Sequence, residues 1–279
     1  MKYSNPRPPE GVNSGDHRPG REFFILTGAL LALGALVLVV VFQFSQWLAP
    51  WVPFSWERKV ETPFVSALLG EGALKGETQA ALQRLAERLA GAMDVPEGVT
   101  VRVHYAKDPS FNAVATLGGN IIVYQGLLER LPNEDALAMV LAHEIAHVKN
   151  RDVLAAMGGG IFVSIASALV LGEAGAAGDL VGHETLLTML HYSRAKESAA
   201  DQDAVAALAR LYGHGGGAKD LFDLFAQVEA ETGAAHASAL MTSHPLTLSR
   251  LADLQTLARR NGWAMDGPRT PLGGLPDGL

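Results

Sequence analysis

The most apolar part of the chain lies near its N-terminus. Residues 23–56 carry no charge, and residues 23–42 are apolar apart from one threonine and two glycines. A helix of about 20 residues is roughly 30 Å long, which is enough to cross the hydrocarbon core of a bilayer. Residues 43–56 then carry three of the four tryptophans, a residue type that favours membrane interfaces. The pattern predicts a transmembrane anchor over residues 23–49 that contacts the lipid bilayer.

The flanking charges predict the orientation of this anchor. Lysine and arginine are more frequent before it than shortly after it (Lys2, Arg7, Arg18 and Arg21 against Arg58 and Lys59). By the positive-inside rule we expect a cytoplasmic N-terminus and a C-terminal domain on the exported, periplasmic side of an inner membrane. A cleaved signal peptide is the alternative, but the apolar run exceeds the usual core of about 7–15 residues and no Ala-x-Ala-like site follows it. Residues 1–22, rich in proline and glycine, are expected to form a disordered tail.

Beyond residue 57 the hydrophobic pattern changes between helical and extended periods. Apolar residues at helical spacing predict helices over residues 77–93, from 133 to beyond 152, 185–213, 220–230 and 246–260. Alternating residues predict strands over 99–104, 112–117 and 120–124, of which the last two form a hairpin around two glycines. We therefore expect a mostly α-helical domain with a small β-sheet (α+β) over residues 57–262, followed by a loose tail over 263–279.

Composition narrows the chemistry that this domain can carry. The 279 residues contain no cysteine, which excludes a disulfide scaffold and any thiolate metal site. The formal net charge of −7 argues against a nucleic-acid-binding surface. A side-chain metal ligand in this chain is therefore expected to be a histidine, an aspartate or a glutamate.

The helix expected to begin after Asn133 contains the segment His143-Glu144-Ile145-Ala146-His147. Residues four apart share one face of a helix, so His143 and His147 can bind one metal ion. Glu144 reaches the same side and can act as a base on water activated by that ion. This H-E-x-x-H spacing is typical of zinc hydrolases, with a chance match as the competing interpretation.

A catalytic zinc needs a third protein ligand besides an open position. The candidate is Glu197, on the helix expected from residue 185, with Asp201 one turn later on the same face. Small residues between the two acids allow another helix to approach closely. An exposed acidic face is the alternative. In the presence of the upstream motif, the better interpretation is that Glu197 is a ligand and that Asp201 binds a ligand histidine.

Four segments resemble, in order, a family of zinc endopeptidases. This family contains HtpX, the CAAX prenyl endopeptidase and the mitochondrial Oma-type protease. The matching segments are Asn112–Ala115 with Gly118–Leu128, His143–Asp152, Ser193–Asp201 (S-R-x-x-E-x-x-A-D), and Ser243–Pro245 followed by Arg250 (S-H-P-x-x-x-x-R). The resemblance covers roughly residues 57–262. It implies a zincin-like metallopeptidase with one Zn²⁺ per chain, behind one N-terminal span where HtpX has several.

The resemblance also implies roles for further residues. Asn112, Ala113 and Val114 would belong to the edge strand along which an extended polypeptide pairs. His244 would face the zinc, either donating to the oxyanion of the intermediate or occupying the open coordination position in a resting state. A structural histidine is the alternative. Arg250 is expected to pair with acids near the site. The implied substrates are unfolded or misassembled membrane or envelope proteins, and a non-catalytic binding or assembly factor is the competing function.

A second uncharged run, residues 153–172, is as long as the first. A single membrane crossing there would put His147 and Glu197 on opposite sides, where they cannot bind one ion. Residues 173–192 contain three acids and do not supply a return span. We therefore expect a buried or membrane-apposed helix, with a short re-entrant segment as the alternative.

Overall fold

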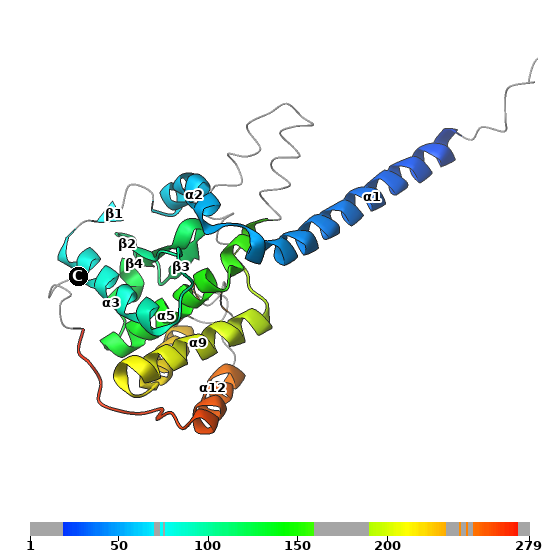
Figure 1. Ribbon diagram of the computed structural model, residues 1–279. Helices are drawn as coiled ribbons and strands as arrows, with labels where there is room; N and C mark the ends of the chain where they lie inside the picture. The colour runs from blue at the N-terminus through cyan, green and yellow to red at the C-terminus, as the bar shows by residue number, and fades with distance from the viewer. Residues whose placement is uncertain are drawn as a thin grey trace, which may run out of the picture. The chain divides into compact units, whose positions relative to one another are not determined.

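The computed structural model describes residues 19–69, 73–74, 76–158, 190–232, 240, 244 and 248–272. Contacts divide the chain into two compact units, Met1–Gln43 and Phe44–Leu279. The first unit contains most of the N-terminal helix. The second contains the sheet and the remaining helices, whose arrangement is drawn in Figure 1.

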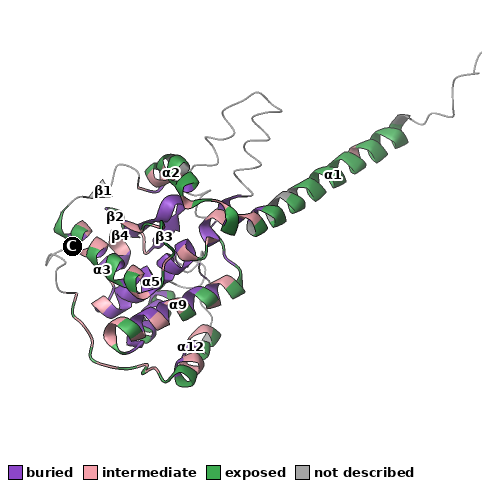
Figure 2. Ribbon diagram, in the orientation of Figure 1, coloured by how far each residue is buried: buried purple, intermediate pink, exposed green. Residues whose placement is uncertain are grey.

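Helix α1 spans Pro19–Leu48 and confirms the predicted N-terminal apolar helix. Within the described residues, Gly20–Val37 is the one stretch long and apolar enough to cross a membrane. Its side chains are exposed along the helix, with Leu26 and Leu30 each 69% exposed (Figure 2). A helix without a polar face is unfavourable in water, so this exposure supports association with a membrane.

The described strands form one mixed sheet in the order β1-β2-β4-β3. They are β1 (Ala73–Leu74), β2 (Arg102–Ala106), β3 (Ala113–Thr116) and β4 (Asn120–Tyr124). β3 and β4 pair antiparallel across the 3-10 turn η2 (Leu117–Gly119), as predicted, and β2 pairs parallel to β4. β2 starts later than the expected residue 99. Because β3 is last in the order, it is an edge strand of this sheet.

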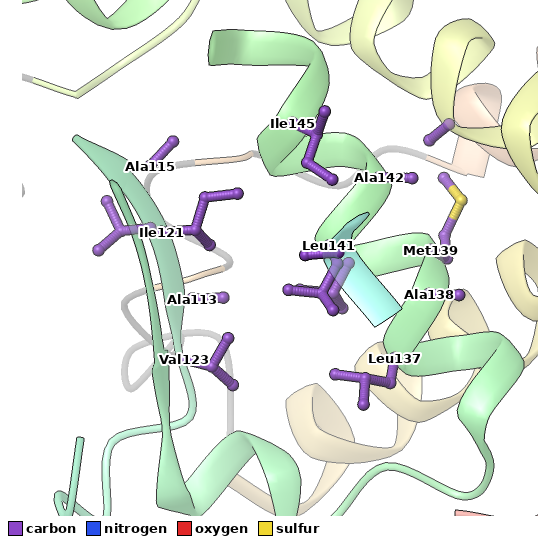
Figure 3. Close-up of a cluster of buried hydrophobic side chains, with 14 of the residues drawn as sticks. Ala113, Ala115, Ile121, Val123, Leu137, Ala138, Met139, Leu141, Ala142 and Ile145 are labelled. Atoms are coloured by element: carbon purple, nitrogen blue, oxygen red, sulfur yellow. The ribbon is translucent and has the colours of Figure 1, made fainter. Parts of the chain in front are cut away.

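Helix α5 (Glu134–Lys149) lies at the centre of the second unit. One of its faces packs on the sheet, where Leu137, Leu141 and Ile145 lie opposite side chains of β3 and β4 (Figure 3). Three helices pack around its other sides, namely α3 (Glu77–Ala92), α9 (Arg194–Tyr212) and α10 (Gly216–Thr232). Burial from several directions holds α5 rigidly, which suits a helix that positions reactive side chains.

The start of α5 agrees with its sequence, whereas its end does not. Asn133 caps the helix as predicted, because its Oδ1 accepts the Ala136 N–H at 2.8 Å. The expectation that the helix runs past residue 152 is wrong. Arg151 has a left-handed backbone with φ of 61°, so α5 ends at Lys149 and helical structure resumes at Asp152.

The second apolar run is described only over residues 153–158, which are helical and partly or fully buried. Residues 159–172 lie outside the described residues. The placement of this run relative to a membrane therefore stays a prediction.

The other helices differ from expectation mainly at their starts. α9 begins at Arg194 and not at residue 185, because Ser193 caps it by accepting the Lys196 N–H at 3.4 Å and residues 190–193 are not helical. Its end at the left-handed Gly213 was expected. α10 begins at Gly216, ahead of the expected residue 220. α12 (Leu248–Asn261) lies within the predicted range to one residue.

Four parts of the second unit were not anticipated. Three elements have no counterpart among those predicted, namely α2 (Phe54–Leu69), preceded by the 3-10 turn η1 (Ala49–Trp51), the strand β1, and α4 (Gln125–Leu128). Residues 263–272, assigned by sequence to a loose tail, run back along the domain. The Glu134 N–H donates to Thr270 O at 2.9 Å, and Arg269 Nε lies 2.5 Å from Asp220 Oδ2.

Candidate metal centre

Four buried side chains from three parts of the chain meet beside α5. They are His143 and His147 of α5, Glu197 of α9, and His244, whose neighbours on both sides lie outside the described residues. One ligand atom of each lies within 4.8 Å of all the others. The fold therefore brings together two histidines at helical spacing, a glutamate from 50 positions further along, and a histidine from a third segment.

The distances between these atoms are close to those between the ligand atoms of a zinc ion, or a few tenths of an ångström shorter. His143 Nε2 lies 3.1 Å from His147 Nε2 and 3.2 Å from His244 Nδ1. Glu197 Oε1 lies 2.9 Å from His244 Nδ1 and 3.5 Å from His147 Nε2. In a tetrahedral zinc site with bonds of about 2.0–2.2 Å, donor atoms are roughly 3.3–3.6 Å apart. Three imidazole nitrogens and one carboxylate oxygen are also a donor set that zinc accepts.

Each α5 histidine has a carboxylate on its second ring nitrogen. His143 Nδ1 lies 3.0 Å from Asp201 Oδ1, and His147 Nδ1 lies 3.0 Å from Asp152 Oδ2. A carboxylate at this nitrogen fixes the tautomer in which Nδ1 carries the proton and Nε2 presents its lone pair to a metal. The Tyr192 ring stacks on His147, with centroids 4.0 Å apart, and limits rotation of the imidazole.

Asp152 and Tyr192 were not among the predicted site residues. In a continuous helix, residues five apart point about 140° away from each other, so spacing argued against Asp152. The break at Arg151 brings the Asp152 carboxylate back toward His147. The only sequence feature that could have indicated Tyr192 is its position just before the predicted Ser193 segment. That position does not distinguish an aromatic site residue from an aromatic core residue.

Glu144 is held by the edge strand. Its Oε2 accepts the Ala115 N–H at 2.7 Å, and its Oε1 lies 3.5 Å from His244 Nε2. The carboxylate is therefore fixed between β3 and the histidine cluster, and it is 1% exposed. A carboxylate in this position can exchange a proton with a water or substrate group at the cluster.

Arg250 links Glu197 and Asp201 of α9. Its Nε and Nη2 donate to the two carboxylate oxygens of Asp201 at 2.7 and 2.8 Å, and its Nη1 lies 3.0 Å from Glu197 Oε2. This pairing with acids near the site is the arrangement expected from the sequence. The bidentate geometry orients Asp201 and, through it, His143.

Carboxylates control the protonation of the cluster. Burial alone lowers the pKa of His143, but hydrogen bonds with Asp201 and Glu197 raise it to about 10. Burial raises the pKa of Glu197, yet the neighbouring histidines hold it well below its usual range. Burial lowers the pKa of His244, which keeps its imidazole neutral. The ionised carboxylates of Glu197 and Asp201 beside His143 favour a cation at this position.

The predicted substrate strand lies directly beside this cluster. Asn112 precedes β3, and its carbonyl accepts the Tyr124 N–H at 3.1 Å, so it faces β4. Ala113 and Val114 belong to β3. Since peptide groups alternate along a strand and the Ala115 N–H points to Glu144, the Ala113 peptide also faces away from β4. That is the side on which a further strand would add.

The segment after α1 contacts both sides of the site. Glu57 of α2 accepts the Gly118 N–H at 2.9 Å through Oε2, and its Oε1 lies 2.5 Å from Arg151 Nη1. Arg151 Nη2 donates to Val52 O at 2.5 Å. Gly118 needs a positive φ of 74°, and a Cβ there would collide with Glu61 of α2. α2 therefore fits closely against the turn that ends β3 and against the residue before Asp152.

Comparison with known proteins agrees with this geometry. Residues 76–258 match the family model described as Peptidase family M48. The chain is 31% identical over 158 residues to the mitochondrial metalloendopeptidase OMA1 of Schizosaccharomyces pombe, covering 55% of this chain and 45% of the relative. It is 32% identical over 162 residues to the beta-barrel assembly-enhancing protease of Escherichia coli (strain K12), covering 53% and 32%. Over 95 residues it is 42% identical to a protease HtpX homolog of Moorella thermoacetica, covering 32% and 30%.

The chain spans less than half the length of each of these relatives. The matched segment contains His143, His147, Glu197 and His244. It is two thirds of the chain and includes the whole of the histidine–glutamate cluster, so the chain belongs to peptidase family M48 and its matched domain is that of a metalloprotease.

Proposed function

We propose that this protein is a zinc-dependent endopeptidase held at a membrane by residues 23–49. The observation that carries the proposal is the buried cluster of three histidines and Glu197, with Glu144 fixed beside it. The catalytic domain would be residues 57–262, with a zincin-like arrangement of helix α5 against the edge strand. The contacts of residues 263–272 with Glu134 and Asp220 would extend this domain beyond residue 262.

His143, His147 and Glu197 are proposed to hold one zinc ion. When bound, zinc supplies Lewis-acid activation of water and of the substrate carbonyl. Asp152 and Asp201 hold the two α5 histidines in the tautomer that binds metal. Arg250 neutralises part of the charge of Asp201 and Glu197 and fixes their positions.

Glu144 is proposed as the general base and acid. Its carboxylate would take a proton from the attacking water and return it to the leaving amine. The substrate would lie extended along β3, pairing through the peptide groups of the strand that face away from β4. The hydrogen bond from the Ala115 N–H then positions the base with respect to that strand.

His244 has two possible roles at this site. Its Nδ1 lies among the ligand atoms, which supports occupation of the fourth coordination position in a resting state. Its Nε2 is near Glu144, which also suits donation to the oxyanion after the ring moves away from Glu197. We propose the first role for the arrangement in this structure and the second for turnover.

Membrane or envelope quality control is the proposed biological role. Relatives named as a beta-barrel assembly-enhancing protease and as a mitochondrial metalloendopeptidase support it, as does the exposed apolar helix. Polypeptide substrates follow from the family, and the proposed natural substrates are unfolded or misassembled proteins. We propose that α1 crosses an inner membrane once, with the catalytic domain on the exported side.

Glu144→Gln tests the proposal. The full chain in detergent, loaded with zinc, is expected to cleave unfolded casein, whereas the variant loses at least about 100-fold in rate because the base is absent. Zinc content is expected to stay at one per chain, since Glu144 is not a ligand. Equal cleavage by both proteins, or none by either, would refute the enzyme hypothesis and favour the non-catalytic binding factor.

A further inference from the structure

A group of aromatic side chains lies exposed where the chain passes from α1 into the second unit. Within the described residues, the large apolar side chains that are mostly exposed all lie between Phe23 and Trp56. Four of them belong to the second unit and form what we call the aromatic belt: Phe44, Trp47, Trp51 and Trp56, with exposed fractions of 50%, 65%, 74% and 62%. An exposed apolar group of this size indicates a surface that binds a partner.

The chemistry of this belt fits the headgroup layer of a bilayer. An indole combines an apolar ring with an N–H donor, and tryptophan therefore gathers at membrane interfaces. The belt also continues from the apolar helix, since η1 begins at the residue after the end of α1. Arg58 and Lys59 follow as exposed residues of α2, where they can reach anionic lipid phosphates. Indoles beside basic residues, in continuity with an apolar helix, favour a lipid surface over a protein partner.

The chain from the belt into α2 also contacts the framework of the metal centre. We call residues 51–57 the linking segment. Its Val52 carbonyl accepts Arg151 Nη2, and its Phe54 ring centroid lies 5.4 Å from the Arg151 guanidinium. Glu57 Oε1 pairs with the same arginine. The linking segment thus exposes two indoles on one side and holds a buried arginine on the other.

Two groups of the site depend on these contacts. Arg151 has the left-handed backbone that brings Asp152 to His147 Nδ1. Glu57 also accepts the Gly118 N–H at 2.9 Å, just beyond the strand that binds the proposed base. A shift of the linking segment would therefore change the orientation of one metal-binding histidine and of the base. A surface that binds the ordered segment more tightly would stabilise both.

We propose that the aromatic belt binds the headgroup layer of a bilayer and that this contact fixes the linking segment, so that the lipid surface raises the activity of the peptidase. The inference rests on the proposed function and adds a regulator of the same site. A bilayer favours the ordered arrangement only through stronger contact with it. Trp51 and Trp56 supply that contact because they belong to the linking segment, whereas Trp47 belongs to α1.

The lipid contact is tested by a measurement that needs no catalysis. The full chain is placed in nanodiscs of phosphatidylcholine with about 30% phosphatidylglycerol. Single-tryptophan proteins retain Trp51, Trp56 or Trp263, and the other tryptophans are changed to phenylalanine. Lipids brominated near the headgroup or deep in the acyl chain quench nearby indoles. We expect headgroup-side bromine to quench Trp51 and Trp56 at least about twice as strongly as deep bromine. Neither should quench Trp263, which packs against the core.

The coupling to the site is tested in the same nanodiscs with zinc-loaded protein. Trp51→Gln/Trp56→Gln should lower kcat/KM for unfolded casein by about fivefold or more, because the ordered segment loses its lipid contact. Zinc affinity, measured against a competing chelator, should fall by about threefold or more, because His147 is less firmly held. Trp51→Phe/Trp56→Phe keeps apolar rings and should hold both values within about twofold.

Trp47→Gln is the matched control. Its exposed fraction is between those of Trp51 and Trp56, but it lies outside the linking segment. It should change neither kcat/KM nor zinc affinity by more than about twofold. Thermal unfolding of each variant reports whether it is folded.

The outcomes separate this inference from the proposed function. Quenching of Trp51 and Trp56 no stronger than that of Trp263 would overturn the lipid contact. Unchanged activity in the folded double glutamine variant, or an equal loss in Trp47→Gln, would overturn the coupling. Each of these results leaves the endopeptidase hypothesis intact. The expected quenching in a zinc-loaded wild type that cleaves no substrate would instead refute the proposed function, and the lipid contact would stand.

Discussion

Asp152 is expected to strengthen metal binding through His147, and Asp152→Asn isolates this effect. The Asp152 carboxylate is buried, with Oδ2 3.0 Å from His147 Nδ1 and Oδ1 3.2 Å from Lys196 Nζ. Asparagine has nearly the same shape but no charge. Its amide oxygen can accept a weaker hydrogen bond from His147 Nδ1–H. If the amide rotates, its NH₂ group faces a ring nitrogen that must itself carry a proton, and no hydrogen bond forms.

The expected magnitude follows from what the carboxylate does to the ring. It makes Nε2 a better donor and holds the tautomer and orientation that a metal requires. Loss of such a partner commonly costs about 10–100-fold in metal affinity, or roughly 1.4–2.8 kcal/mol. The stacked Tyr192 ring still limits rotation of His147, so we expect the lower half of this range.

The assay is a zinc titration of the chelator-treated protein against a competing fluorescent chelator. Two control variants separate the carboxylate–histidine bond from other effects of charge. Lys196→Met removes the other partner of Asp152 and should change zinc affinity by less than about threefold. Asp203→Asn removes an acid of α9 whose partner is Lys149 at 3.1 Å and should leave affinity unchanged.

Zinc affinity of Asp152→Asn within about twofold of wild type, with unchanged thermal unfolding, would show that the positioning argument is wrong. An equal loss in Asp203→Asn would show that affinity follows the total negative charge of α5 and α9 and not the contact with His147.

Two further predictions concern stability. Arg151→Met leaves Glu57 without its buried partner and should lower the free energy of unfolding by about 3–5 kcal/mol in urea titrations. Lys219→Met breaks an exposed ion pair and should leave the free energy of unfolding nearly unchanged. Equal effects of the two variants would show that burial of the Glu57–Arg151 pair does not determine its contribution to stability. Burial alone raises the pKa of Asp220, but its hydrogen bonds with Arg269 lower it below the ordinary value. Its stabilisation is therefore complete above about pH 4 and is lost as pH falls through the folded pKa, so Asp220→Asn should reduce the acid sensitivity of unfolding. An unchanged pH profile in that variant would refute this account.

The parts of the site that sequence predicts are those fixed by local geometry. His143, Glu144 and His147 follow from the helical repeat, and Asn133 was recognisable as a cap because its side chain precedes two acids. Glu197 could be chosen only because the first two histidines required another oxygen or nitrogen ligand. In each case a short-range rule, or a rule of metal chemistry, decides the position.

The parts that sequence did not predict depend on contacts between distant segments. Nothing in the local sequence predicts a left-handed Arg151, because arginine is a good helix former. Its conformation is supported by Val52, Phe54 and Glu57, which precede it by about a hundred positions. The start of α9 was placed too early for a related reason, since the cap at Ser193 is effective only where the preceding chain departs from a helix.

These long-range contacts explain why the site needs more than α5 and α9. Glu57 holds the Gly118 N–H at one end of the edge strand and Arg151 at the end of α5. Through Gly118 it supports the strand that binds Glu144, and through Arg151 it supports the turn that brings Asp152 to His147. The base and one metal-binding histidine are thus oriented by the same buried carboxylate. Because α2 follows the apolar helix α1 along the chain, a segment next to the proposed membrane anchor is part of the framework that orders the catalytic groups.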